Sequence, residues 1–230
     1  MEIKEIVSKH NQDFRYLSEA DLEEISQASF IRSYKKGQVL FHPGDHRTHL
    51  YLLKTGVIRI EKSDSSGDFF YMHFVKAGCL FPRIGLFQDG AHSDSAIAHT
   101  DIEIVVIPVK VFEKNIRENP QQLMKWIQIQ SDLLKLFMTR MQKGMTNNAC
   151  QRVMTTLAIL FNDLGAPLNA RGQVIIPCPM KINDIAKMSG TTRETTSSII
   201  KKLVKMNKIS YNHKQLTFLD TAFFIQRLEN

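Results

Sequence analysis

The sequence has few cysteines and no long apolar run. Its three cysteines, Cys79, Cys150 and Cys178, stand far apart and form no CxxC or CxH pair. This spacing excludes a recognisable zinc knuckle or cysteine-only iron–sulfur motif, and it argues against a disulfide framework. No segment approaches the ~20 apolar residues that a membrane-spanning helix needs, and the N-terminus lacks the apolar core of a signal peptide. We therefore expect a cytoplasmic protein without a membrane partner.

The composition is that of an ordinary globular protein, but its charge is unevenly distributed. Hydrophobic residues make up 43% of the 230 and charged residues 23%, which excludes extensive disorder, and the length suggests two domains. The formal net charge is +7, and residues 147–230 hold 11 Lys and Arg against 5 Asp and Glu. A basic C-terminal part beside a nearly neutral remainder indicates a module that binds a polyanion. A merely solubilising surface charge is the alternative.

Short β-type runs separated by glycines fill the N-terminal half. They are QVLFH, HLYLLK, VIRIEK, FFYMHFV and EIVVIPV, all rich in β-branched or aromatic residues, with turns such as HPGD between them. Short strands at this spacing predict an antiparallel sandwich, roll or barrel.

A long helix is predicted from about Asn119 to Met145. Along it a stripe repeats at spacings of 4, 3, 4, 3, 4 and 4, which is typical of a coiled-coil seam. The stripe comprises Leu123, Ile127, Gln130, Leu134, Phe137, Met141 and Met145. At ~1.5 Å per residue the helix is about 40 Å long, which favours a dimer spine. The alternative is a helix packed on its own domain, with Trp126, Leu133 and Met138 widening the face.

A further helix is predicted at Cys150–Leu164, with Asn148 as its N-cap. The most specific motif follows at residues 180–210: two apolar-faced helices joined by a tight turn at Gly190. The first has apolar Ile182, Ile185 and Ala186, and the second has Ile199, Ile200, Leu203 and Val204 on its buried face. Two short runs, ISYNH and QLTFLD, then predict a β-hairpin wing. These segments indicate a winged helix-turn-helix, with a two-helix hairpin of no function as the alternative.

The sequence resembles the Crp/Fnr family of bacterial transcription regulators over nearly its whole length. The resemblance rests on TTRETTSSIIKKL in the second helix of the motif, on GQVLFHPGD, HLYLLKTGVIRI and GLFQDG in the strand region, and on the long helix. It implies an α+β fold: an antiparallel β-roll sensor domain at 1–116, a dimerisation helix at 117–146 and a winged helix-turn-helix domain at 147–230. It also implies a homodimer that binds palindromic promoter DNA and contacts RNA polymerase, without enzymatic activity or an evident cofactor.

The candidate DNA contacts lie in the second helix of the motif. Positions at which family members touch base edges are matched by Arg193, Glu194, Ser197 and Ser198, and the candidate set also includes Thr192, Thr196, Lys201 and Lys202. Arginine can bond bidentately to guanine, and a carboxylate can accept from the cytosine amino group. Two alternatives stay open: Thr191 and Glu194 have the spacing of a capping box, and Arg193 also suits a phosphate contact. Many relatives have arginine in place of Ser198, so we expect one missing contact and a different operator.

The candidate effector site departs from the cyclic-nucleotide branch of the family. In that branch a Gly-Glu pair before the GLF turn holds the ribose, and an Arg-Ser pair after it binds the cyclic phosphate. This chain has Pro82-Arg83 and Asp94-Ser95 instead, and a carboxylate at Asp94 would repel phosphate. We expect no cyclic AMP binding, with Arg83 and Ser95 as the remaining candidates for an anion; a cyclic-nucleotide or other small-ligand sensor is the alternative function. The cysteine cluster of the iron–sulfur branch is absent, and LFPRIGLF is similar to the Gram-positive branch that activates the arginine deiminase pathway.

Seven of the eight histidines lie before residue 100, and His42, His46 and His49 are close in sequence. Such a group can bind zinc or haem. On an antiparallel roll, however, His42 and His49 fall on different strands, so we expect surface histidines and no metal site. A cupin-like metalloenzyme would need a compact His-x-His and Glu spacing, which is absent. Cys79 suits either redox sensing or simple packing, and the identity of any effector stays open.

Overall fold

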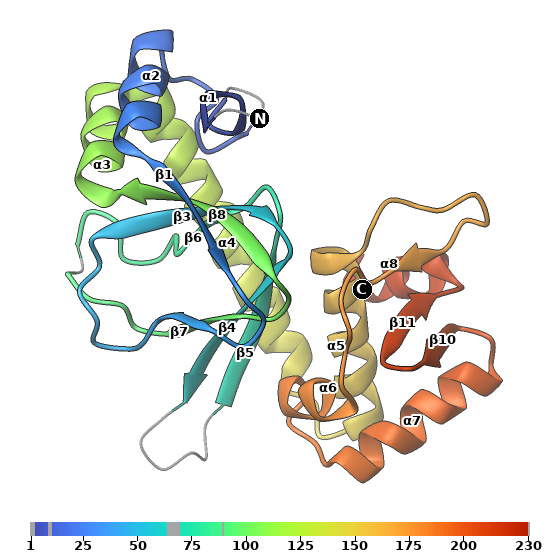
Figure 1. Ribbon diagram of the computed structural model, residues 1–230. Coiled ribbons are helices and arrows are strands. Elements are labelled where there is room, and N and C mark those ends of the chain that lie inside the picture. Colours follow the sequence, from blue (N-terminus) through green and yellow to red (C-terminus); the bar gives the residue numbers. More distant parts are fainter. Residues whose placement is uncertain (1–2, 9–10, 64–69, 89, 230) are drawn as a thin grey trace. The chain divides into compact units, whose positions relative to one another are not determined.

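A computed structural model describes residues 3–8, 11–63, 70–88 and 90–229 (Figure 1). It confirms the predicted α+β class, with antiparallel sheets in the N-terminal part and a helix-turn-helix with a small sheet in the C-terminal part. Asp89 of the GLFQDG segment lies outside the described residues. The chain forms two compact units, residues 1–61 with 75–137 and residues 62–74 with 138–230, so the predicted dimerisation helix is shared between them. Within the described ranges, no helix is long and apolar enough to cross a membrane.

The N-terminal strands form two four-stranded sheets, and every predicted run contributes a strand. The first sheet has the order β1-β8-β3-β6, with strands Phe30–Tyr34, Ile102–Pro108, His49–Thr55 and Leu80–Phe81. The second has the order β2-β7-β4-β5, with strands Val39–Phe41, Ser95–Ala98, Val57–Ser63 and Phe70–Lys76. Strand β8 pairs antiparallel with both β1 and β3, and β7 pairs antiparallel with both β2 and β4.

Strand β8 is apolar from Ile104 to Pro108 because its two faces reach two different cores. Ile104 and Val106 belong to a core shared by both sheets, together with Phe41 and Ile58. The side chains of a strand alternate between faces, so Val105 and its neighbours on the other face pack against helices. The unbroken apolar run IVVIPV is thus the pattern of a strand buried on both sides.

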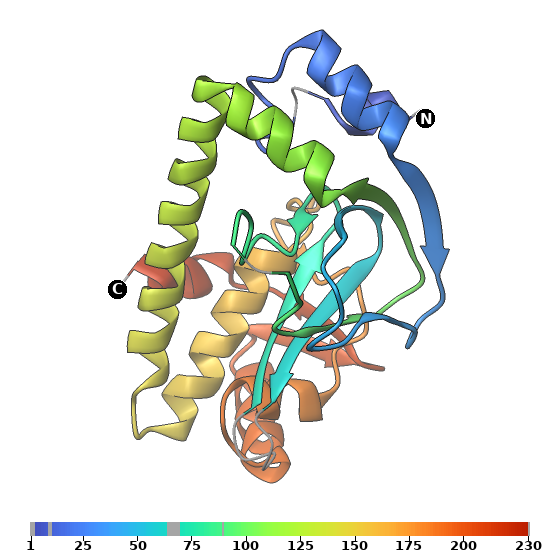
Figure 2. The same ribbon diagram turned by 90° about the vertical axis from the view of Figure 1, so that its left-hand side faces the viewer.

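Four helices pack on that second core: α1 (Ile3–Ile6), α2 (Glu19–Ala28), α3 (Val109–Glu118) and α4 (Pro120–Gly144). Figure 2 shows α2 and α3 side by side, with α4 continuing from α3 around a sharp corner. The ring of Phe112 on α3 meets Phe14 edge-on at 5.9 Å and Trp126 on α4 at 5.5 Å, measured between centroids. These aromatic contacts fix the first turns of α4 against its own unit.

The C-terminal unit contains the remaining elements: α5 (Ala149–Leu164), β9 (Val174–Ile175), α6 (Ile182–Met188), α7 (Arg193–Lys205), β10 (Ile209–Asn212), β11 (Gln215–Phe218) and α8 (Thr221–Glu229). Its sheet has the order β10-β11-β9. Asn148 caps α5 as predicted, since its side chain accepts from the N–H groups of Cys150 and Gln151 over 2.9 and 3.2 Å. The rings of Phe218 and Phe224, 4.6 Å apart, help to close the core of this small unit.

Candidate nucleic-acid interface

The helix-turn-helix is formed by α6 and α7. The turn between them passes through Gly190, whose φ of 56° is in the left-handed region, and the Thr191 N–H donates to the Ala186 carbonyl over 3.1 Å. The Ser189 hydroxyl donates to the Ile185 carbonyl over 2.8 Å and so closes the end of α6. Ile185 and Ala186 are buried, as the sequence predicts. A small residue and a glycine thus allow two helices to approach across a tight turn.

The first turn of α7 is capped by Thr192. Its hydroxyl accepts a hydrogen bond from the Thr195 N–H over 3.2 Å. The predicted capping box of Thr191 and Glu194 is therefore wrong, because Thr191 lies one residue before the cap. Glu194 is exposed in the first turn of α7, where the helix dipole favours a carboxylate.

The inner face of α7 consists of Thr196, Ile199, Ile200 and Leu203. Thr196 is 0% exposed, and its hydroxyl donates to the Thr192 carbonyl over 2.9 Å. Its prediction as a DNA contact is therefore wrong, since the side chain is bonded inside the unit. Val204, predicted to be buried, is 41% exposed. It follows Leu203 directly, and one residue turns a side chain by about 100° around a helix.

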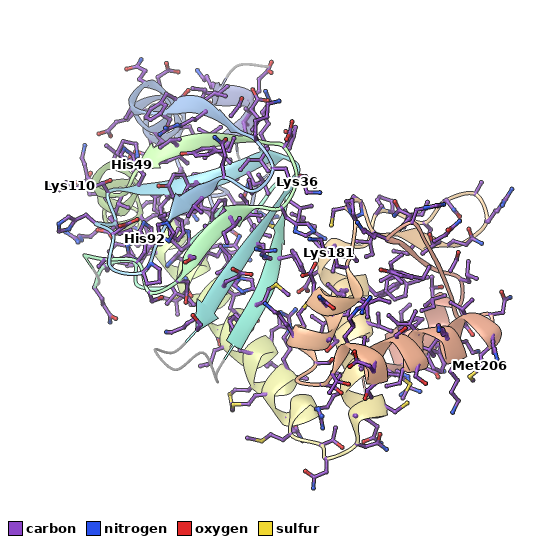
Figure 3. The ribbon with its side chains drawn as sticks, turned by 60° about the horizontal axis from the view of Figure 1, so that its bottom comes forward. Lys36, His49, His92, Lys110, Lys181 and Met206 are labelled. Atoms are coloured by element: carbon purple, nitrogen blue, oxygen red, sulfur yellow. The ribbon has the colours of Figure 1, made fainter. Side chains whose placement is uncertain are left out.

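The outer face of α7 is polar and mostly basic. Its exposed side chains are Arg193, Glu194, Ser198, Lys201, Lys202, Val204 and Lys205, and Ser197 is half-buried beside them. Residues spaced by three or four share a helical face, so Glu194, Ser198 and Lys201 form a stripe opposite the buried side. Lys205 continues this stripe; it was missing from the predicted set, although its spacing from Lys201 reveals it. Met206, the C-cap residue, marks the far end of the helix in Figure 3.

The wing is the antiparallel hairpin of β10 and β11, as predicted. Its tip consists of His213 and Lys214, both exposed, with φ values of 48° and 67° that suit a two-residue type I′ turn. The Tyr211 hydroxyl donates to the Met180 carbonyl over 2.7 Å and ties the hairpin to the segment before α6. The wing therefore adds the exposed Lys214 to the basic side chains that α7 presents in the same unit.

Comparison with known proteins connects this geometry to a family. Residues 31–119 match the family model of a cyclic nucleotide-binding domain, and residues 151–224 match that of a Crp-like helix-turn-helix domain. The HTH-type transcriptional regulator ArcR of Staphylococcus epidermidis is 30% identical over 186 residues, which cover 81% of this chain and 80% of the relative. The chain belongs to the Crp/Fnr family of transcription regulators.

Other Crp/Fnr regulators are similar over most of the chain. The cAMP-activated global transcriptional regulator CRP of Salmonella typhimurium is 24% identical over 192 residues, covering 83% of this chain and 90% of the relative. The solved structure of FixK2 from Bradyrhizobium japonicum has a TM-score of 0.72 and 22% identity, and covers 88% of this chain and 96% of that one. The helix-turn-helix of this Crp/Fnr regulator is its DNA-binding element, and the family consists of transcription regulators and not of enzymes.

Helix α4 of the regulator has two different faces. One packs within its own unit, where Gln122, Trp126 and Ile129 are buried. The other is an exposed apolar stripe, which we call the α4 stripe. It comprises Met124, Ile127, Leu134, Met138, Met141 and Met145.

The predicted seam residues divide between these two faces. Ile127, Leu134 and Met141 belong to the α4 stripe, and Leu134 is 62% exposed. Leu123 packs against the core of its own unit, and Gln130 donates through Nε2 to the Arg83 carbonyl over 3.2 Å. Phe137 is half-buried between the faces. The predicted seam therefore included residues from two faces of α4. This happened because more than one set of apolar residues on α4 repeats at alternating spacings of three and four.

Arg83, a predicted ligand of an effector anion, already has an anionic partner. Its Nη2 lies 2.6 Å from Oδ2 of Asp13, and the Asp13 side chain is fully buried. Burial raises the pKa of Asp13, and the charge of Arg83 opposes that rise. An effector anion would have to compete with this carboxylate, which the sequence did not reveal because the two residues are 70 positions apart.

Arg47 is the arginine that sequence reasoning missed in this region. Its guanidinium donates to the Ile84 and Gly85 carbonyls, so it holds the loop after β6. The other candidate, Ser95, is half-buried at the start of β7. His92, which is labelled in Figure 3, stacks on Phe41 at 3.7 Å between ring centroids, and burial lowers its pKa.

The histidines close in sequence do not form a ligand set. His42 and His46 are exposed, and His49 contacts the Thr48 hydroxyl through Nδ1 over 2.8 Å. Among the described residues, no three His, Cys, Asp or Glu side chains come together as metal ligands. Cys79 and Cys150 are half-buried and Cys178 is buried, and these three cysteines form no disulfide.

Proposed function

We propose that this regulator is a homodimer that binds a palindromic promoter site, with one α7 helix in each half-site. The observation that carries the proposal is the outer face of α7: Arg193 and Glu194 in its first turn, followed by hydroxyls and then by lysines. A helix with base-reading side chains at its N-terminal end and cations beyond them suits a major groove flanked by phosphates. Ser198 is short, so it reaches less of a base pair than an arginine at this position would.

Dimer formation is supported by the α4 stripe. Six exposed apolar side chains along α4 and the residue that follows it are a large surface to leave in water, and four of them are methionines, which adapt well to a partner. Their spacing matches that of a two-stranded coiled coil. A homodimer also explains how a small unit recognises a long site, since two α7 helices read half-sites about 34 Å apart.

The direct test is selection of DNA fragments from a random pool by the purified full-length protein, followed by sequencing. We expect an inverted repeat whose half-sites are one helical turn apart. Arg193→Ala serves as the matched variant, because it should lose enrichment of one base position. Enrichment of single half-sites, or of no sequence at all, would contradict the proposal.

A cyclic-nucleotide sensor is the second candidate, and the family match over residues 31–119 favours it. Against it stand the ion pair of Arg83 with Asp13 and the carboxylate of Asp94 where the family branch has arginine. We therefore propose that the roll does not take cyclic AMP. Titration calorimetry should give no saturable heat with cyclic AMP, and the affinity for the selected operator should not change; saturable binding would favour the second candidate.

Two further proposals follow from promoter binding. A regulator that sits on a promoter is positioned to contact RNA polymerase, and a protein that binds chromosomal DNA in a bacterium acts in the cytoplasm. Co-sedimentation with polymerase on operator DNA, compared with either protein alone, tests the first.

A further inference from the structure

One arginine of α5 binds three carbonyl groups from two separate segments. Arg152 donates from Nη1 to the Thr146 carbonyl over 2.9 Å, from Nε to the Ser189 carbonyl over 3.0 Å, and from Nη2 to the Gly190 carbonyl over 3.1 Å. All four residues belong to the C-terminal unit. A planar guanidinium has five donors in a fixed arrangement, so it can hold several acceptors at set positions.

The two segments that Arg152 joins have different tasks. Thr146 lies in the connection between α4 and α5, directly after the last residue of the α4 stripe. Ser189 and Gly190 form the turn between α6 and α7, two residues before the Thr192 cap. Figure 2 shows the chain turning sharply from α4 into α5 at this point. The guanidinium therefore links the end of the stripe to the start of the helix that faces DNA.

A second link fixes the last turns of α4 to α5. Arg140 on α4 donates through Nη2 to both carboxylate oxygens of Asp163, at 2.6 and 2.7 Å, and both side chains are largely buried. Asp163 is in the last turn of α5, whereas Arg152 is in its first. Helix α5 is thus tied near both ends to α4 or to its exit, and the final residues of the stripe form one body with α7.

We propose that Arg152 is a positioning residue that sets the separation of the two α7 helices in the dimer, and hence the half-site spacing that the regulator accepts. The inference rests on the proposed homodimer. In the proposed dimer, the two copies of α7 are connected to each other only through the α4 stripe. Any movement of the turn between α6 and α7 relative to the end of α4 would therefore change the distance between the two α7 helices. Arg152 removes this freedom because it bonds the turn and the exit of α4 with one rigid group.

The experiment measures affinity for a series of operators in which base pairs are added or removed between the half-sites. One added base pair moves a half-site by about 3.4 Å and rotates it by about 34°. We expect the wild-type protein to lose roughly tenfold in affinity at one added base pair, comparable to a mismatch. Arg152→Gln should lose about tenfold on the native spacing, the effect of one charge-assisted hydrogen bond, while its penalty for the added base pair falls to about twofold.

Two further variants keep the test independent of folding and of charge. Arg152→Lys retains the charge but not the three-way bonding, so it should fold and still show the smaller spacing penalty. Arg171→Gln removes the same charge from an exposed loop of the same unit, so it should weaken all spacings equally. Circular dichroism checks that each variant is folded.

The outcomes separate this inference from the proposed function. If the wild-type protein sediments as a monomer or shows no spacing preference, both the homodimer proposal and the role of Arg152 are overturned. If the wild-type protein prefers one spacing and a folded Arg152→Lys keeps the full wild-type preference, only the positioning role is overturned. A reduced preference in Arg152→Lys, together with an unchanged preference in Arg171→Gln, supports it.

Discussion

At the scale of single residues, α7 exposes two kinds of cation that we propose contact DNA differently. Arg193 lies in the first turn, where its planar fork can reach guanine, whereas Lys201 lies two turns further on. Arg193→Ala should cost about 1–3 kcal/mol of binding free energy on the operator and little on random DNA. Lys201→Ala should weaken binding to both DNAs equally and reduce the salt slope by about one. Fluorescence anisotropy with the two DNAs gives the ratio of operator affinity to random-DNA affinity. Equal losses of affinity for both DNAs in Arg193→Ala would indicate that this residue contacts phosphate.

Glu194 can be tested separately because Thr192, and not Glu194, takes part in the cap of α7. Glu194→Gln should leave the midpoint of thermal unfolding nearly unchanged and relax the preference for one base pair, since a neutral amide no longer selects the cytosine amino group. Thr192→Ala is the contrasting variant, expected to lower the free energy of unfolding by about 1 kcal/mol through loss of the cap. A large loss of stability in Glu194→Gln would return this carboxylate to a structural role.

His73 on β5 should make the stability of the regulator depend on pH. Burial lowers the pKa of His73 to about 4, and the charge of Arg140 acts in the same direction. An unfolded histidine has a pKa of 6.5, so between pH 6.5 and 4 the unfolded chain binds more protons and the free energy of unfolding falls with falling pH. Each unit of this pKa difference is worth about 1.4 kcal/mol.

Urea unfolding of the wild-type protein and of His73→Gln, at steps from pH 7 to 4, measures this contribution. The variant should lose less stability over the window than the wild-type protein, whereas His46→Gln, at an exposed histidine, should follow the wild-type curve. Parallel curves for the wild-type protein and His73→Gln would refute the assignment.

At the scale of elements, the α4 stripe is the surface on which the proposed dimer depends. Leu134→Glu combined with Met141→Glu places two charges among exposed apolar side chains, which should prevent the burial that holds a dimer together. We expect a folded monomer in analytical ultracentrifugation that has lost operator binding. Gln128→Glu is the matched control, since Gln128 is exposed on α4 outside the stripe. An unchanged dimer in the double variant would remove α4 from this role.

At the scale of the whole molecule, we expect charge and the proposed dimer to contribute different parts of DNA binding. Residues 147–230 carry most of the net charge of +7, and we expect this charge to bind any duplex through release of counterions. The monomeric double variant should therefore keep weak binding to random DNA that falls steeply with salt, and should lose only the excess affinity for the operator. Titrations at several salt concentrations give the affinity for random DNA and the excess affinity for the operator. If the double variant bound the operator as tightly as the wild-type protein, operator recognition would not depend on dimer formation.

The sequence by itself determined the local structure and the family. The β-type runs, the Asn148 cap, the glycine at the turn of α6 and α7, and the two-strand wing are confirmed. Each depends on interactions between residues close in the chain: alternation in a strand, a cap within three residues, or a backbone angle that glycine adopts. The capping box was the local exception, because Thr191 and Thr192 are equally good caps in sequence and the turn decides between them.

Only the tertiary structure decided which faces are buried and which distant residues they contact. It assigned Asp13 to Arg83 and Gln122 to the Tyr16 N–H, pairs that are 70 and 106 positions apart. It also separated the face of α4 that packs on its own unit from the stripe that is exposed, although both fit a heptad. The physical reason is the same in each case. Burial and pairing depend on which distant segment the fold brings near. A periodic pattern in the sequence shows that a helix face is apolar, but it does not identify the segment that packs against that face.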